Sequence, residues 1–121
     1  MNHALLAYDG SPKAKEALYL STYLASRWNI SLTIVSVMES SRVTNETLRE
    51  ALAYAERRDV KPALVGKSRD VAEAILQTAD EQNCDFFVMG GYGHNPIVEA
   101  ALGSAVDQIL RETDKPVLIS R

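Results

Sequence analysis

The residues best suited to chemistry are the glycines and the hydroxyl group of one segment in the last third of the chain. Residues 90–104 read GGYGHNPIVEAALGS and hold four of the six glycines of the protein. A glycine-rich backbone that leads into a helix exposes N–H groups that can hold an anion without lysine or arginine. The pattern favours phosphate binding, and a flexible turn followed by a helix cap is the alternative.

Other motifs for nucleotide binding or catalysis are missing from the sequence. The P-loop sequence G-x-x-x-x-G-K-[ST] does not occur, and Pro96 interrupts any dinucleotide fingerprint. His3 and His94 are far apart, no metal-spaced cluster accompanies them, and Cys84 is expected to be a buried thiol. We therefore predict no catalytic residue and no metal ligand. A slow ATP hydrolase, in which Asp9 would orient water, is the enzymatic alternative.

Composition argues against several classes of partner. The net charge is −3, and lysine and arginine are scattered, so no basic surface for nucleic acid is expected. No apolar run approaches the ~20 residues that span a bilayer, and the first residues do not resemble a signal peptide. We expect a cytoplasmic protein with neither a nucleic-acid nor a membrane partner.

Five near-continuous apolar runs of strand length would supply the framework. Such runs are typical of parallel strands that are covered on both faces. They cover residues 3–8, 31–38, 61–65, 85–89 and 116–120. Segments with helical periodicity separate them, and Ser11 with Pro12 predicts the start of the first helix.

The caps of the later helices are predicted from side chains that can accept a backbone hydrogen bond. Thr44 or Asn45 is expected to cap the second helix, and Ser68 the third. A fourth helix is expected at about residues 104–111. Only residues 39–43 then separate the second strand from the second helix, which would leave a ligand there little covered.

The alternation of strands and helices predicts one α/β domain over residues 1–121. We expect an open, doubly wound, Rossmann-like parallel sheet of five strands in the order 3-2-1-4-5, with helices on both faces. Ligands of such sheets bind beyond the carboxyl ends of the strands, where the strand order reverses. The loops there include residues 9–11, 38–41, 66–69 and 90–104.

Three blocks of the sequence, in order, resemble the universal stress protein family. They are ALLAYDGSPKAKEAL at 4–18, NCDFFVMGGYGH at 83–94 and KPVLISR at 115–121. The pattern Gly90-x2-Gly93-x9-Gly103-Ser104 is similar to the G-x2-G-x9-G-[ST] signature of the ATP-binding subgroup. The resemblance covers the whole chain. It implies a regulatory or stress-response domain that binds an adenine nucleotide, ATP or AMP, with or without Mg²⁺.

The resemblance also implies roles for individual residues. Asp9 would accept hydrogen bonds from the ribose hydroxyls, as an acceptor-only carboxylate can. Ala7 and Tyr8 would flank the adenine, Val37 would read its edge through the backbone, and Met89 would complete an apolar wall. The other nucleotide-binding residues that it implies are Met38, Gly90, Gly91, Gly93, His94, Gly103, Ser104 and Ala105.

One departure from the family pattern leaves the number of phosphates open. Between the second and third motif glycines the sequence HNPIVEAAL contains no lysine or arginine, and a neutral imidazole at His94 adds no charge. Lys67 and Arg69, expected in the loop after the third strand, could reach the phosphates instead.

The last predicted strand, residues 116–120, is short and apolar, and we expect it at the edge of the sheet. An exposed edge invites pairing with another chain, and the resemblance implies a homodimer through this strand. An interaction or dimerisation module that binds no nucleotide, or a sensor domain of a larger protein, is the non-enzymatic alternative.

Overall fold

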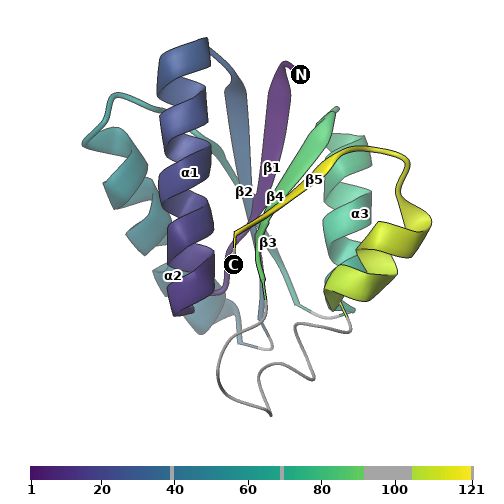
Figure 1. The fold of residues 1–121 in the computed structure, drawn as a ribbon. Coiled ribbons are helices and arrows are strands. Elements are labelled where there is room, and N and C mark those ends of the chain that lie inside the picture. Colours follow the sequence, from purple (N-terminus) through teal and green to yellow (C-terminus); the bar gives the residue numbers. More distant parts are fainter. Residues whose placement is uncertain (39, 69, 92–104, 121) are drawn as a thin grey trace.

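Five parallel strands form one sheet in the order β3-β2-β1-β4-β5 (Figure 1). The computed structural model describes residues 1–38, 40–68, 70–91 and 105–120. The strands are β1 (His3–Ala7), β2 (Ser31–Val37), β3 (Ala63–Lys67), β4 (Phe86–Gly90) and β5 (Val117–Ser120). The helices are α1 (Pro12–Trp28), α2 (Ser41–Glu56), α3 (Val71–Glu81) and a helical segment that covers residues 105–112. The predicted fold class and strand order are confirmed.

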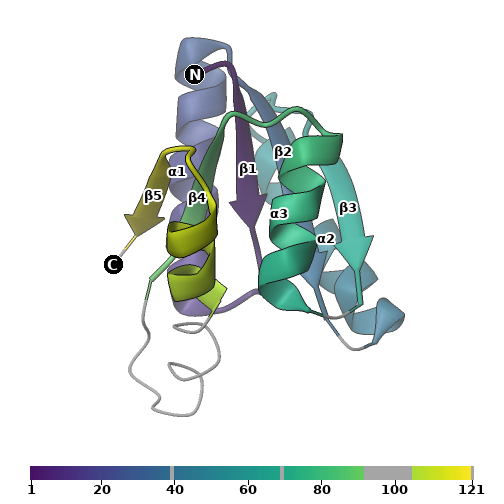
Figure 2. The same cartoon turned by 90° about the vertical axis from the view of Figure 1, so that its right-hand side faces the viewer.

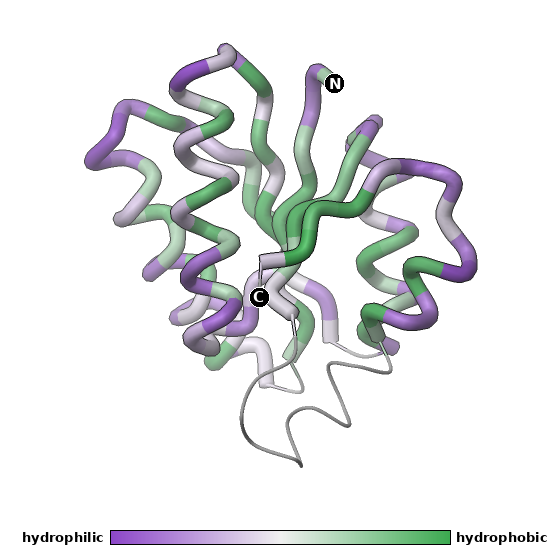
Figure 3. Tube along the Cα trace, viewed as in Figure 1, coloured by the Kyte–Doolittle hydropathy of each residue, from purple (hydrophilic) through white to green (hydrophobic). Residues whose placement is uncertain are grey.

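Helices cover both faces of the sheet, and neighbouring strand residues pack into different layers. On β1, Leu6 packs with α1 and α2, whereas Leu5 packs with α3 and segment 105–112. On β4, Val88 likewise packs with α1 and α2, and Phe87 packs with α3 and segment 105–112. Figure 2 shows α3 and segment 105–112 in front of the sheet, and Figure 3 shows the hydrophobic residues gathered along the strands. Each buried apolar side chain contributes about 1.5–3 kcal/mol, so these two layers are the main support of the fold.

The second helix begins earlier than predicted. Ser40, not Thr44 or Asn45, is the N-cap of α2, and its side chain accepts a hydrogen bond from the N–H of Val43 at 3.5 Å. Thr44 is buried in the first turn and donates its hydroxyl to the Ser40 carbonyl at 3.1 Å. The prediction was wrong because Ser40 lies outside the apolar periodicity that marks the helix.

The third strand lies two residues further along the chain than predicted. It covers Ala63–Lys67 instead of residues 61–65, so Gly66 is part of the strand and not of the following loop. A Cβ atom at Gly66 would lie 2.9 Å from Cγ2 of Thr44 on α2. The glycine therefore serves the close approach of a helix to the sheet, although glycine in a sequence more often marks a turn.

Several connections turn through residues with positive φ. Among the described residues other than glycine these are Asn29, Asp59, Asp70 and Asn83. Asparagine and aspartate tolerate the left-handed region better than other side chains. Asp70 is the N-cap residue of α3, with a φ of 52° and no side-chain cap hydrogen bond, so the predicted cap at Ser68 is wrong.

Two expectations from composition can be compared with the structure. Cys84 is buried, as predicted, and this burial raises the pKa of its thiol. In the part of the chain that the structure describes, no helix combines the length and the apolar character needed to cross a bilayer.

At the amino ends of the strands, hydrogen bonds to the Asp85 carboxylate link the start of β4 to the start of β1. Asp85 accepts hydrogen bonds from the N–H of Asn2 at 2.8 Å and from the N–H of His3 at 3.2 Å. The bond from Asn2 is the largest cause that lowers the pKa of this carboxyl below its ordinary value of 3.8. The Nε2 atom of His3 also lies 2.7 Å from the Oγ1 atom of Thr33. Asp85 in its charged form therefore stabilises this edge.

Replacing Asp85 with asparagine should lower the free energy of unfolding at pH 7 by about 1 kcal/mol, because a neutral amide accepts weaker hydrogen bonds than a carboxylate. The folded-state pKa lies below 3.8, so this contribution is present above that pH and is lost as the pH falls through the folded-state pKa. Urea unfolding of both proteins, followed from pH 7 to pH 2, should show a difference that shrinks in acid. Asp114→Asn, at an exposed site, is the matched control. An equal loss in both variants at every pH would contradict the role of Asp85.

Candidate functional site

The chain turns sharply between β1 and α1 at the carboxyl edge of the sheet. Asp9 Oδ1 accepts a hydrogen bond from the N–H of Ser11 at 3.0 Å. Gly10 between them has a φ of +81°, a conformation that glycine adopts at little cost. Ser11 then caps α1 by accepting from the N–H of Ala14 at 3.2 Å, and Pro12 follows at the start of the helix, as predicted. The turn holds the Asp9 carboxylate beside the ends of the central strands.

A cavity of about 50 Å³ opens beside this turn, where the strand order reverses between β1 and β4. Seven of the nucleotide-binding residues predicted from the sequence line it: Ala7, Tyr8, Asp9, Val37, Met89, Gly90 and Ala105. Strand order alone makes this edge the expected ligand site of an open α/β sheet. Seven of the nine predicted residues that the structure describes therefore line one cavity.

The remaining predicted residues lie beside the cavity or outside the described part of the chain. Met38 donates its N–H to the carbonyl of Lys67 at 3.2 Å, and Gly91 donates to the carbonyl of Ser120 at 2.6 Å. Both hydrogen bonds fix the backbone where strands β2 and β4 end. The other predicted residues, which lie outside the described residues, are Gly93, His94, Gly103 and Ser104.

The cavity is small, and larger hollows exist elsewhere. Complete small-molecule sites usually enclose ~300–1,000 Å³. A hollow of about 590 Å³ lies at the amino ends of the strands, near Ser31 and Lys61, and one of about 240 Å³ lies between α1 and α2. We assign the candidate site to the smaller cavity because it lies at the reversal point of the sheet and is mainly apolar. The walls of this cavity would have to move apart to admit the base of a nucleotide.

Tyr8 borders the cavity, but its ring is packed in the layer formed by α1 and α2. The residue is 2% exposed, and its ring packs with α1 and α2. Its hydroxyl donates a hydrogen bond to Glu50 Oε1 at 3.0 Å. Burial, followed by the hydrogen bond that the hydroxyl donates to Glu50, raises the pKa of this phenol well above its usual range. The ring is thus committed to the α1/α2 layer, although the residue also borders the cavity.

Gly90 has a packing role that its glycine motif did not reveal. A Cβ atom there would lie 2.6 Å from the carbonyl carbon of Lys13 and 2.7 Å from the backbone nitrogen of Ala14. These are backbone atoms in the first turn of α1 and cannot move aside without shifting the helix. The glycine lets the end of β4 meet α1 directly.

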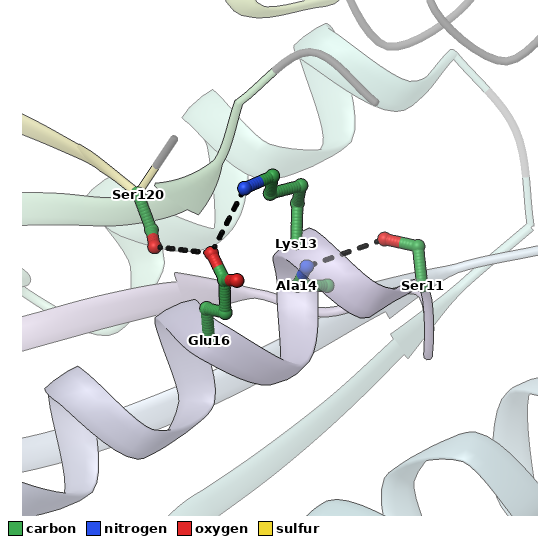
Figure 4. A network of polar contacts seen from close by, with 5 residues as sticks. All are labelled: Ser11, Lys13, Ala14, Glu16 and Ser120. Atoms are coloured by element: carbon green, nitrogen blue, oxygen red, sulfur yellow. Dashed lines mark hydrogen bonds and ion pairs between the residues drawn. The ribbon is translucent and has the colours of Figure 1, made fainter. Parts of the chain in front are cut away.

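Two lysines near the carboxyl edge are each paired with a glutamate. Lys13 Nζ lies 3.3 Å from Glu16 Oε2, and the Ser120 hydroxyl donates to the same oxygen at 3.2 Å (Figure 4). Lys67 lies in β3, not in the loop where it was expected, and its Nζ is 3.7 Å from Glu81 Oε2. Arg69 lies outside the described residues.

Sequence reasoning missed about half of the apolar wall of the cavity. Val35, Val71, Ile75 and Val106 line it together with the predicted residues. Their apolar character and helical or strand periodicity indicate burial, but the same pattern marks every core residue. Only the strand order and the packing of α3 show that they meet at this edge.

The comparisons with known proteins agree on one family. The model of the universal stress protein family matches residues 39–121. A Thermus aquaticus protein, described as a universal stress protein in the QAH/OAS sulfhydrylase 3′ region, is 33% identical over 132 residues, which cover 97% of this chain and 96% of its own. A crystal structure of a universal stress protein family member from Burkholderia pseudomallei is 27% identical, with a TM-score of 0.79, and the match covers 98% of this chain and 94% of that one.

Other solved structures with this fold were determined with adenine nucleotides. A universal stress protein in complex with cAMP has a TM-score of 0.82 at 24% identity, over 99% of this chain and 96% of its own. An Archaeoglobus fulgidus protein with dAMP has a TM-score of 0.76 at 19% identity, over 100% and 98% of the two chains. An Arabidopsis thaliana protein with AMP has a TM-score of 0.78 at 16% identity, and the match covers 98% of this chain and 90% of that one. Identities this low show the shared fold alone.

Replacing Gly90 with alanine should destabilise the protein by more than about 2 kcal/mol, because the new methyl group meets the backbone of α1. Gly66→Ala is the matched comparison, since its methyl group meets one side-chain carbon of Thr44 at 2.9 Å and no backbone atom that close. Thermal unfolding of the two variants tests this order. A smaller loss for Gly90→Ala than for Gly66→Ala would show that the contact between β4 and α1 is not tight.

Proposed function

Because this chain belongs to the universal stress protein family, we propose that it binds an adenine nucleotide at the carboxyl edge of its sheet. The observation that carries the proposal is the gathering of seven predicted nucleotide-binding residues around the cavity between β1 and β4. In this proposal residues 1–121 form a single domain that acts in regulation or in a stress response. Nucleotide occupancy would be the signal that it carries.

The cavity suits one flat face of a base. Val35, Val37 and Met89 give it apolar walls from β2 and β4, and Ile75 adds one from α3. Stacking a base against these side chains removes apolar surface from water, which favours binding. Backbone groups at the ends of β1 and β2 would distinguish adenine from other bases.

The ribose would lie against the Asp9 carboxylate. One oxygen of Asp9 accepts from the N–H of Ser11. A carboxylate has about four lone-pair sites, so it retains acceptor capacity for two hydroxyl donors. The turn thus fixes the carboxylate in place before a ligand arrives.

We propose ATP or AMP as the ligand, with Mg²⁺ as a counter-ion for a triphosphate. The cAMP, dAMP and AMP complexes of structural neighbours support the adenine part of this proposal. The lysines near the carboxyl edge are held by Glu16 and Glu81. Four charges of a triphosphate would therefore be harder to offset here than two of a monophosphate.

We also propose a homodimer through β5. This strand pairs with β4 on one side and is the last strand of the sheet. Leu118 on it is 38% exposed. Unpaired N–H and C=O groups on an apolar edge strand favour pairing with a second copy of the same strand.

An interaction module without nucleotide is the second candidate, and the small volume of the cavity, about 50 Å³, favours it. In that case the exposed edge of β5 would be the functional surface. The two candidates differ in one observable, which is whether the purified protein takes up a nucleotide at all.

The wild-type protein should release an adenine nucleotide on denaturation, identified by mass spectrometry, or should bind added AMP or ATP in calorimetry. Ala7→Val should weaken this binding at least tenfold, because two extra methyl groups fill the cavity. The melting temperature should change little, since the added atoms enter an open hollow. Ala53→Val, on the exposed surface of α2, is the control and should bind as the wild type does. If the wild type binds neither AMP nor ATP with Mg²⁺ present, the nucleotide proposal fails and the interaction module replaces it.

The protein should sediment as a dimer, and Leu118→Lys should make it a monomer, because a charge on the apolar edge strand opposes pairing. Leu110→Lys, which alters an exposed leucine of segment 105–112, should leave the dimer intact. Analytical ultracentrifugation over a range of concentrations measures both. A monomeric wild type, or dissociation by both substitutions, would rule out β5 as the specific contact.

A further inference from the structure

Lys13 is a cation in the first turn of α1, next to residues that line the candidate cavity. The residues near it in sequence, Ser11 and Ala14, both line the cavity. Its own backbone lies against Gly90, another lining residue, where β4 ends. Figure 4 shows its side chain extending toward the end of β5 at Ser120. The family motif did not single out this lysine.

The partner of Lys13 holds it weakly. The pair with Glu16 joins side chains that are 23% and 47% exposed, and solvent-accessible pairs of this kind contribute little to stability. Glu16 Oε2 also accepts a hydrogen bond from the Ser120 hydroxyl. The carboxylate therefore keeps a partner when the ammonium group leaves, which lowers the cost of separating the pair.

A phosphate group competes well for such an ammonium group. A phosphate monoester carries nearly two negative charges at neutral pH, whereas the Glu16 carboxylate carries one. Charge-assisted hydrogen bonds from lysine to phosphate are among the stronger polar contacts. Lys67 belongs to β3, which β2 separates from β1, whereas the backbone of Lys13 lies against the end of β4.

We propose that Lys13 exchanges Glu16 for the phosphate of the bound nucleotide and so distinguishes a nucleotide from a nucleoside. The proposal rests on nucleotide binding at this edge. Glu16 acts as the competitor: it holds Lys13 in the empty protein and releases it to the phosphate. Its removal therefore strengthens nucleotide binding, which a merely structural ion pair would not do.

Lys15 provides a matched comparison within the same helix. It lies two residues further along α1 and is also paired with a glutamate, Glu50, at 3.5 Å. That glutamate belongs to α2 and also accepts the Tyr8 hydroxyl. Lys15 thus lines the hollow between α1 and α2.

The test is calorimetric titration of Lys13→Gln, Lys15→Gln, Glu16→Gln and the wild type with adenosine and with AMP. Lys13→Gln should weaken AMP binding roughly tenfold and leave adenosine binding unchanged, since only AMP carries a phosphate. Glu16→Gln should strengthen AMP binding by a few-fold. Lys15→Gln should bind both ligands as the wild type does, and higher salt should reduce the wild-type preference for AMP.

The possible results distinguish a failure of the role of Lys13 from a failure of nucleotide binding. A wild type that binds neither ligand overturns nucleotide binding itself. A wild type that binds AMP, with the same affinity in Lys13→Gln, overturns the role of Lys13 and leaves nucleotide binding standing. An equal loss of adenosine and AMP binding in Lys13→Gln would show that the lysine only maintains the shape of the site.

Discussion

The direct contact between two backbones at Gly90 is the constraint on which the carboxyl edge of this protein depends. The end of β4 lies so close to Lys13 and Ala14 that no Cβ atom fits between them. This approach sets the height of the first turn of α1 above the sheet. The Ser11 cap and the Asp9 turn follow from it, because both belong to the chain that enters that helix. The candidate cavity is thus bounded by a corner with little freedom to move.

A sheet covered on both faces assigns neighbouring residues to different tasks. At the end of β1, Ala7 packs in the layer of α3, whereas the next residue, Tyr8, packs in the layer of α1 and α2. The hydroxyl of Tyr8 then joins Glu50 and Lys15 in a polar cluster, and the three residues line the hollow between α1 and α2. Two consecutive residues of the sequence block at 4–18 therefore pack in opposite layers of the core. Strand periodicity, more than proximity in sequence, decides which residues a ligand can reach.

The fold could be predicted almost completely from the sequence, and the site only in part. Five apolar runs with helical segments between them leave few arrangements other than a doubly wound parallel sheet. The errors concern Gly66 and the caps at Ser40 and Asp70, where a tertiary contact or a left-handed backbone decides the boundary. The site residues came from the family resemblance, since Val35 and Ile75 cannot be told from core residues without the packing of α3. Ion pairs such as Lys67 with Glu81 join distant elements, so no local pattern reveals them.

The crowding at Gly90 also has a genetic consequence. Every amino acid other than glycine has a Cβ atom, so any missense change in this codon places an atom against the backbone of α1. At Gly10 the situation is different, because a Cβ atom there would lie 3.9 Å from Thr47 and meet only the cost of a left-handed backbone. Asparagine or aspartate could be inherited at that position with modest harm. Two glycines near the carboxyl edge of one sheet should therefore differ widely in the variation that a population of this gene can carry.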